Sequence, residues 1–214
     1  AGRVVPRGIR YLDVPVSGTS DQVLRGDGVA LIGGDPSITN EVKDVFDALF
    51  VRRFHVGKVG DGGRAKLAVN LILGLNRLAL AEGLVFAERL GLDPAAFLDV
   101  ARGSASYSQV METKGPKMVR GDFSAEGRVK QTLKDVHLML DQAAAVGQKL
   151  SVLGVHADVL EACVRAGEAE DRGDRWVLLH DALQLGELLR HRRKGDGLIG
   201  DDLSDHDAGI LLGE

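Results

Sequence analysis

The pattern of apolar and polar positions changes character at about residue 60. Before it, short apolar runs alternate with turn residues such as glycine, serine and aspartate, which is typical of short strands. Pro36 follows one such turn and is well placed to open a helix over 36–49. The strands are expected at 9–16, 28–33 and 50–56. Three short strands and one helix form only a marginal unit alone, so this part indicates the closing portion of an α/β sheet.

After residue 60 the apolar residues recur at helical spacing. They do so from Gly63 to Leu90 with isolated glycines as the only interruptions, which predicts one helix of about 28 residues and roughly 42 Å. Gly91 and Pro94 mark its end and a new start. Further helices are expected at 94–102, 106–114, 127–146, 151–166 and 176–190, with a break at 114–117. The predicted fold class is therefore mostly α with a small α/β piece at the N-terminus.

Three parts are expected along the chain. Residues 1–58 form the α/β piece and residues 59–190 form a helical domain. Residues 191–214 form a tail that begins within the basic run 190–194 and continues acidic and glycine-rich, so we expect it to be poorly ordered.

Composition narrows the classes of partner and compartment. The 214 residues carry a net charge of −4, which gives no general attraction to nucleic acid or to an anionic membrane. No uninterrupted apolar run approaches the roughly 20 residues of a membrane span. The single Cys163 excludes an internal disulfide and favours a reducing, cytoplasmic setting. The six histidines show no metal-ligand spacing, so no metal site is expected.

A glycine-rich turn, Gly60-Asp61-Gly62-Gly63, leads into the long helix. A glycine-lined helix start leaves backbone N–H groups that can hold an anion. Lys66 and Asn70 follow four residues apart, which places an amine and an amide on one helix face. Lys66 lies in an almost wholly apolar stretch, where a buried lysine must pair with an anion or lower its pKa. It is therefore a candidate proton donor and acceptor, although a lysine on an amphipathic helix more often extends to water.

The same turn matches part of the dinucleotide-binding pattern, as Gly60-x-Gly62-x-x-Ala65. A dinucleotide-binding unit, however, needs a second parallel strand within about 30 residues. The helix instead continues to Leu90, so a substrate-side site is the better interpretation. Ser17-Gly18-Thr19 offers hydroxyls and a glycine N–H at the end of a strand, or it is a simple turn. Lys134-Asp135 is in isolation a surface pair.

Together these segments resemble the β-hydroxyacid dehydrogenase family, which includes 3-hydroxyisobutyrate dehydrogenase and tartronate semialdehyde reductase. The resemblance runs from about residue 7 to about residue 166. Its most specific parts are the Pro-Val-Ser-Gly segment and the Lys66/Asn70 segment. The residues that carry it are Asp13-Val14-Pro15-Val16-Ser17-Gly18, Gly33-Gly34-Asp35, Gly57-x-x-Gly60-x-Gly62-x-x-x-Lys66-x-x-x-Asn70, Glu82, Gly91-Leu92-Asp93-Pro94, Gly121-Asp122-Phe123 and Leu133-Lys134-Asp135.

The resemblance implies hydride transfer between NAD or NADP and a short 3-hydroxy acid or semialdehyde. Lys66 would be the general acid/base, and Asn70 and Asp135 would hold the substrate and shape its pocket. Ser17, Gly18 and Thr19 would bind the substrate carboxylate. Lys134 would contact the nicotinamide end of the cofactor.

The resemblance also implies the architecture. The N-terminal piece would be the last strands of a Rossmann-type NAD(P)-binding sheet, and the helical domain would resemble the C-terminal domain of 6-phosphogluconate dehydrogenase. The family's glycine-rich cofactor fingerprint lies in the part of that sheet which is absent from this sequence, so the chain alone is expected to be inactive. A homodimer or homotetramer through the helical domain is expected.

Two alternatives stay open. The chain could be a non-catalytic helical dimerisation module, with the glycine turn as a helix cap. It could also be an imine-reductase-like enzyme, although imine reductases usually lack a lysine at the position of Lys66.

Overall fold

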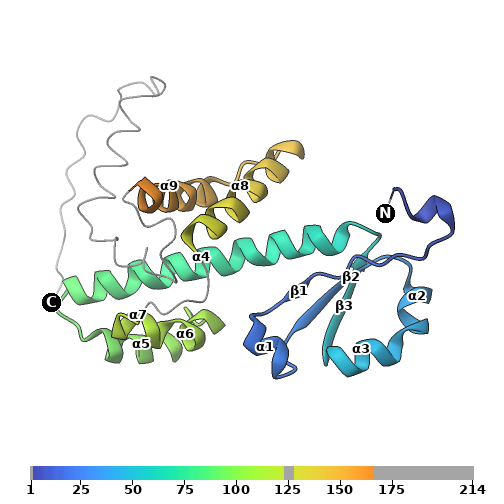
Figure 1. Ribbon diagram of the computed structural model, residues 1–214. Helices are drawn as coiled ribbons and strands as arrows, with labels where there is room; N and C mark the ends of the chain where they lie inside the picture. Colours follow the sequence, from blue (N-terminus) through green and yellow to red (C-terminus); the bar gives the residue numbers. More distant parts are fainter. Residues whose placement is uncertain (1, 123–127, 166–214) are drawn as a thin grey trace, which may run out of the picture.

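The computed structural model describes residues 2–122 and 128–165, and a three-stranded sheet forms its N-terminal part. Strand β2 (Val29–Gly33) is central. It pairs antiparallel with β1 (Val16–Ser17) and parallel with β3 (Arg52–Gly57). Three helices flank the sheet (Figure 1): α1 (Ser20–Leu24), α2 (Pro36–Glu41) and α3 (Lys43–Leu49). The sheet and α3 share a small core around Ala30, Ile32 and Phe46.

The first strand is much shorter than expected over 9–16. Only Val16–Ser17 forms strand, preceded by a single bridge between Asp13 and Gly33. Ile9 and Tyr11 are 52% and 40% exposed, so their apolar character does not reflect a buried strand. A short 3-10 helix, Val5–Arg7, lies further toward the N-terminus.

Two helix boundaries in this part also differ from expectation. The segment 36–49 contains two helices instead of one, because Val42 leaves helical geometry between α2 and α3. The turn after β1 continues directly into α1. Thr19 caps this helix with its side chain, and Gln22 completes the reciprocal pair of hydrogen bonds.

The long helix α4 (Asp61–Arg89) is confirmed and connects the two parts of the molecule (Figure 1). Its first turn packs directly on the sheet. A Cβ added to Gly62 would lie 2.6 Å from the carbonyl oxygen of Asp13 and 2.7 Å from that of Leu31. Only a residue without a side chain allows this approach of helix to strand.

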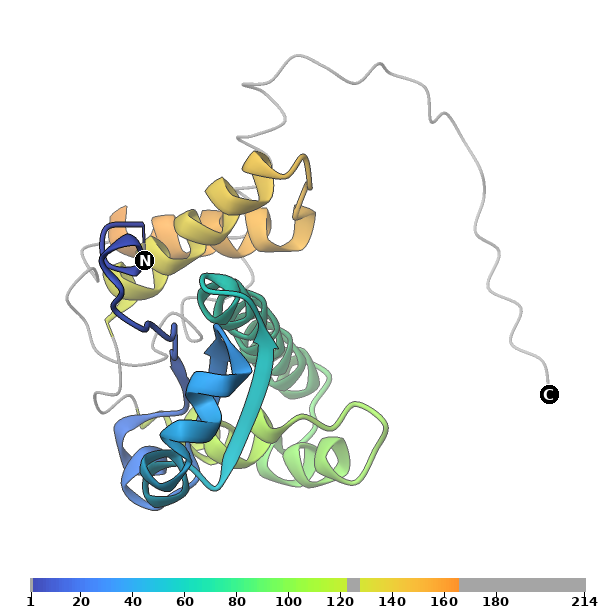
Figure 2. The same ribbon diagram turned by 90° about the vertical axis from the view of Figure 1, so that its right-hand side faces the viewer.

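Five further helices pack around α4 on two sides (Figures 1 and 2). On one side lie α5 (Pro94–Arg102), α6 (Gln109–Thr113) and α7 (Gly115–Arg120). On the other side α8 (Val129–Ala145) and α9 (Ser151–Arg165) form an antiparallel pair. One apolar core joins α4 to both groups, with Ala81, Leu98, Val136 and Leu160 among its buried members. The mostly helical fold class is thus confirmed.

The helical domain contains one correction. The expected break at 114–117 is confirmed, because α6 ends at Thr113. The helix that follows was not expected: Pro116 lies in the first turn of α7 and opens it. The expected helices 94–102, 127–146 and 151–166 are observed within one or two residues. The expected helix 176–190 and the tail 191–214 lie outside the described residues.

Helix α4 is also long and apolar enough to cross a membrane, by length and composition alone. Its most apolar 18-residue window has a mean hydropathy of 1.5 and is 22% buried, so the expectation that no such segment exists is wrong by this criterion. Core helices of soluble proteins pass the same test. Here all three strands and α5–α9 contact α4.

Candidate active site

One face of α4 forms the wall of a cavity of about 660 Å³. The face carries Lys66, Asn70, Leu73 and Arg77, which succeed one another at intervals of three or four residues. Helices α1 and α6 provide the other walls and lie on the same side of α4 (Figure 1). Those walls consist of Gly18, Thr19, Ser20, Asp21, Gln22, Arg25, Gln109, Val110, Thr113 and Lys114.

Lys66 is held at the end of β1. Its Nζ donates a hydrogen bond to the carbonyl oxygen of Val16, with an N–O distance of 2.7 Å. Burial lowers the pKa of Lys66 below its ordinary value, and the nearby carboxylate of Asp135 opposes that shift. An anchored amine that gives up its proton more readily than a surface lysine is suited to proton transfer.

The turn from β1 to α1 lines the same cavity as Lys66. Gly18 has a φ of 139°, which a residue with a side chain rarely adopts. The Thr19 hydroxyl accepts a hydrogen bond from the N–H of Gln22 at 3.3 Å. Its own proton therefore points elsewhere and can be donated to a ligand oxygen. Ser17 lies in β1 directly before this turn.

The structure brings four of the seven predicted site residues to the cavity wall: Gly18, Thr19, Lys66 and Asn70. Asp135 and Lys134 lie on α8 and are not among the lining residues. Asp135 acts on Lys66 through its charge and accepts a hydrogen bond from Gln131. Lys134 is exposed.

Sequence analysis missed several polar residues of the same cavity, chiefly Arg77, Gln109 and Lys114. One signal for Arg77 was present, because it follows Lys66 by eleven residues and Asn70 by seven, and so repeats their helix face. Nothing in the sequence pattern places α6 against that face.

Behind Arg77 lies a buried histidine. His156 on α9 is 1% exposed and packs on Gly74, where an added Cβ would lie 3.2 Å from the imidazole Cε1. Burial, with a smaller contribution from the charge of Arg77, lowers the pKa of His156 to about 4. The imidazole is therefore neutral at physiological pH.

The glycine-rich start of α4 is not the anion site that its sequence suggested. The N–H of Gly63 donates to the Asp13 carboxylate at 2.9 Å. The Asp61 carboxylate accepts from the N–H of Lys58 at 2.9 Å and pairs with Arg64. Two carboxylates at this helix start repel a further anion, and neither the turn nor these carboxylates line the cavity.

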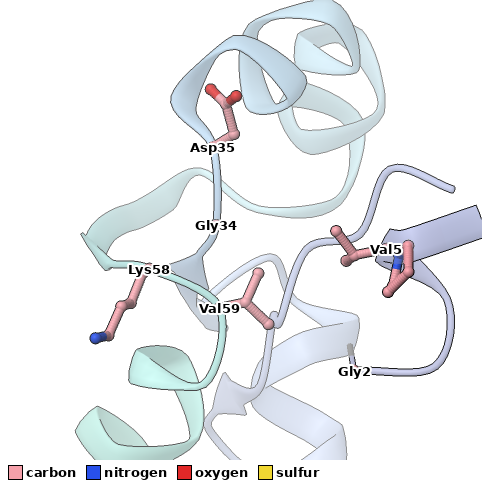
Figure 3. A pocket seen from close by; sticks show the side chains of 7 residues that line it. Gly2, Val5, Gly34, Asp35, Lys58 and Val59 are labelled. Atoms are coloured by element: carbon pink, nitrogen blue, oxygen red, sulfur yellow. The ribbon is translucent and has the colours of Figure 1, made fainter. Parts of the chain in front are cut away.

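A second pocket, of about 580 Å³, lies at the other end of the sheet, beside Gly34 and Lys58, which follow β2 and β3 (Figure 3). Its wall is largely apolar and includes Val5 and Val59. The side chains of Asp35 and Lys58 point to opposite sides in Figure 3, so they do not meet on a common ligand. The first cavity, in contrast, gathers an amine, amides and hydroxyls.

Family models match both parts of the chain. One, described as the NAD-binding domain of 6-phosphogluconate dehydrogenase, matches residues 1–57. Another, described as NAD-binding of NADP-dependent 3-hydroxyisobutyrate dehydrogenase, matches residues 60–177, more than half of the chain. The chain belongs to the β-hydroxyacid dehydrogenase family. The resemblance stated from the Lys66/Asn70 and Pro-Val-Ser-Gly segments is thereby confirmed.

Individual relatives agree with this family. The chain is 30% identical over 184 residues to 2-hydroxy-3-oxopropionate reductase of Escherichia coli, covering 86% of the chain and 61% of that protein. It is 28% identical over 167 residues to the cytokine-like nuclear factor N-PAC of Aedes aegypti, covering 78% of the chain and 30% of that protein. The chain thus spans between about a third and three-fifths of these curated relatives.

The fold has a counterpart among solved structures. A 3-hydroxyisobutyrate dehydrogenase from Salmonella typhimurium superimposes with a TM-score of 0.76 at 23% identity. The match covers 84% of this chain and 63% of that one. The expected arrangement, a Rossmann-type start followed by a helical domain, is therefore the one observed.

Proposed function

We propose that this chain forms the substrate half of an NAD(P)-dependent dehydrogenase that interconverts a short 3-hydroxy acid and its semialdehyde. The observation that carries the proposal is the convergence of Lys66, Asn70, Gly18 and Thr19 on one cavity. The Escherichia coli relative is named for a reductase of a short hydroxylated oxo acid, which agrees with this substrate class.

Each of these cavity residues would have its own role in the reaction. The turn at Gly18 and Thr19 would bind the substrate carboxylate through a backbone N–H and the threonine hydroxyl. Asn70, one helical turn beyond Lys66, would orient the reacting oxygen. The Lys66 amine would take the hydroxyl proton during oxidation and return it to the carbonyl oxygen during reduction. Its lowered pKa and its anchoring to Val16 prepare it for both steps.

A bound nicotinamide would supply or accept the hydride. The amide side chains of Asn70 and Gln109 fit a nicotinamide ring with its carboxamide, and the cavity has room for both ring and substrate. The glycine turn at the start of α4 does not fit the pyrophosphate, since the carboxylates of Asp13 and Asp61 already occupy that helix start. This chain would therefore contact only the nicotinamide end of the cofactor. We assign Lys134 to that contact as well.

Replacement of Lys66 tests the catalytic proposal. In a protein that carries this chain together with a dinucleotide-binding domain, Lys66→Ala should lower kcat by about 1,000-fold, the usual range for a lost general acid/base. Lys58→Ala, on the preceding turn and outside the cavity, is the matched control and should retain activity. Retained turnover in Lys66→Ala with a native circular dichroism spectrum would remove Lys66 from the mechanism.

We further propose that the isolated chain is inactive, because the start of α4 does not fit a pyrophosphate and the chain spans about three-fifths of its Escherichia coli relative. Calorimetric titration of the chain with NADH and NADPH should show no tight binding. Micromolar affinity for either would contradict this part of the proposal.

A second candidate role is dimerisation, with or without catalysis. Ile72 and Phe86 of α4 are 58% and 65% exposed and lie two helical heptads apart on one face, an arrangement that favours burial against a second copy. Light scattering should show a homodimer or homotetramer that Phe86→Glu dissociates. A monomeric wild-type chain would contradict it.

A further inference from the structure

The side chain of Gln22 lines the cavity beside the turn that would bind the substrate carboxylate. Gln22 lies in the first turn of α1, three residues after Thr19. The N–H of Thr19 donates to Gln22 Oε1 at 2.8 Å, and the N–H of Gln22 donates to Thr19 Oγ1 at 3.3 Å. These two hydrogen bonds hold the glutamine side chain against the turn.

The hydrogen bond from Thr19 also fixes which way the amide group of Gln22 is turned. A backbone N–H can only donate, so the amide atom that meets it must be the oxygen. The amide nitrogen, with its two N–H groups, is therefore turned away from the N–H of Thr19. Within the part of the chain that the structure describes, this nitrogen has no hydrogen-bond partner. The amide is thus a donor whose orientation is set before any ligand binds.

The same contacts determine which donors the turn can offer to a carboxylate. The N–H of Thr19 is already used by Gln22, whereas the N–H of Gly18 has no partner among the described residues. A Cβ added to Gly18 would lie 3.5 Å from both Cβ and Oε1 of Gln22, so the glutamine side chain lies directly beside Gly18. The Gly18 N–H, the Thr19 hydroxyl and the Gln22 amide are therefore three donors at one turn. A carboxylate has two oxygens that can accept all three.

The other polar side chains of α1 are less suited to this contact. Asp21 is a carboxylate and would repel another one. It directly precedes Gln22, so the two side chains diverge by about 100° around the helix axis. Arg25 follows Gln22 by about one turn, but its side chain is 64% exposed and pairs with Asp27 at 3.6 Å. Gln22, in contrast, is half-buried and held by two hydrogen bonds.

We propose that the side-chain amide of Gln22 donates a hydrogen bond to the substrate carboxylate and so helps to fix the acid relative to Lys66. This inference rests on the proposed function and adds a substrate-binding residue that the sequence pattern did not indicate. The capping pair with Thr19 is then more than a helix start, because it also orients the donor.

Replacement of Gln22 by glutamate separates the helix cap from the contact with substrate. A glutamate at this position still accepts from the N–H of Thr19 and completes the capping pair. Its carboxylate cannot donate, however, and it repels the carboxylate of the substrate. Gln22→Ala removes both the cap and the donor but adds no charge. Thermal stability should therefore be equal for glutamate and glutamine and lower for alanine, whereas affinity should fall from glutamine to alanine to glutamate.

Titration of the 214-residue chain with 3-hydroxypropanoate, followed by NMR, measures the affinity. Gln22→Glu should bind this acid about 10-fold or more weakly than the wild type, because it replaces a charge-assisted hydrogen bond by repulsion. Gln22→Ala should bind it about 5-fold more weakly. Gln148→Glu, the same substitution at an exposed residue outside the cavity, should leave the affinity within about 2-fold of the wild type.

The side-chain NH2 signals of Gln22 report the contact directly in the wild type, so this measurement does not depend on the folding of a variant. Once assigned, they should shift in a saturable way as 3-hydroxypropanoate is added. A role in the helix cap alone predicts NH2 signals that do not move and a Gln22→Glu variant that binds like the wild type. Either result overturns the proposal.

The two proposals fail in different ways. If 3-hydroxypropanoate shifts the signals of Gly18 and Thr19 but Gln22→Glu binds it as tightly as the wild type, the proposed function stands and this inference is wrong. If Gln22→Glu weakens binding, but propanoate binds as tightly as 3-hydroxypropanoate and Asn70→Ala changes neither, the contact of Gln22 stands and the assignment of the reacting hydroxyl is wrong. Absence of binding by the wild type contradicts both.

Discussion

Two adjoining stretches, the glycine-rich turn at 60–63 and residues 66–77 of α4, differ in what they contact. The start, Gly60–Gly63, is closed: Gly62 packs against the sheet and the N–H of Gly63 donates to the Asp13 carboxylate. The next three turns, from Lys66 to Arg77, form the wall of an open cavity. Of the glycines in this turn, Gly62 therefore serves packing, and the residues that line the cavity begin one helical turn later, at Lys66. Close packing of Gly62 on the sheet fixes the direction in which the cavity face of α4 points.

The largest effect on stability is expected from a substitution at Gly62, where α4 packs on the sheet. In Gly62→Ala the new Cβ would lie 2.6 and 2.7 Å from two backbone carbonyl oxygens, which cannot move without shifting the strands. We expect a loss of about 3 kcal/mol or more in the free energy of unfolding. Urea unfolding followed by circular dichroism measures it.

The neighbouring glycine is the matched control. A Cβ at Gly63 would meet only the Asp13 carboxylate oxygen, at 3.8 Å. Gly63→Ala should therefore be neutral or stabilise the helix by about 0.5–1 kcal/mol, since alanine is the better helix former. Equal destabilisation by both substitutions would show that the packing of Gly62 on the sheet has no special importance.

The next largest effect, on the pH dependence of stability, is expected at His156, which is buried behind the cavity face of α4. The pKa of this histidine falls from the ordinary 6.5 to about 4 in the folded protein. Between these values the unfolded chain binds a proton that the folded chain does not, so stability is lost as pH falls through this window. Between pH 7 and 4 the wild type should lose about 3 kcal/mol more than His156→Leu does.

A second histidine provides the control for this measurement. His137 on α8 is exposed and pairs with Glu161 at 3.2 Å. His137→Gln should keep the acid sensitivity of the wild type. If His156→Leu is as acid-sensitive as the wild type, another group causes the loss of stability.

The contrast between the two stretches also explains what the sequence could predict. Helical periodicity located α4, α5, α6, α8 and α9, whose apolar residues join one core, but it missed the short α7. The strand at 9–16 was predicted wrongly, since an apolar run does not reveal whether a pairing partner exists, and here only Asp13 and Val16–Ser17 find one. Periodicity likewise missed the break at Val42, a local change of backbone angle.

For the site, residues on one helix face or in one turn could be predicted, and residues brought together by packing could not. Lys66 and Asn70 follow from a spacing of four, and Gly18 and Thr19 from a turn after a strand. The contributions of Gln109 and Lys114 depend on how α6 packs against α4, which no local pattern encodes. The anion site expected at Gly60–Gly63 was wrong because Asp13, fifty residues from Gly63, provides the acceptor.

A smaller effect on stability is expected at Thr19, in the turn between β1 and α1. Thr19 caps α1 through its hydroxyl, and α1 is only five residues long. Thr19→Ala should cost about 1 kcal/mol of stability, and Thr19→Ser should restore most of it because serine caps equally well. If thermal unfolding shows no difference between alanine and serine at this position, the cap does not stabilise the turn that would bind the substrate.

The smallest effect is expected at Lys66 itself. Its pKa is lowered in the folded protein, so at high pH the unfolded chain holds a proton that the folded chain has released. The wild type should therefore gain stability relative to Lys66→Met as pH rises toward about 10, the ordinary value for lysine. The gain is small because the side chain is only partly buried and solvent screens its charge.

Lys58→Met distinguishes this behaviour from a general effect of lysine removal. Lys58 precedes the closed start of α4, outside the cavity. The stability of its variant should follow that of the wild type between about pH 8 and 10, since both keep Lys66. If Lys66→Met and Lys58→Met respond to pH alike, Lys66 does not titrate differently from a surface lysine. Lys66 would then lack the lowered pKa on which its proposed role in proton transfer depends.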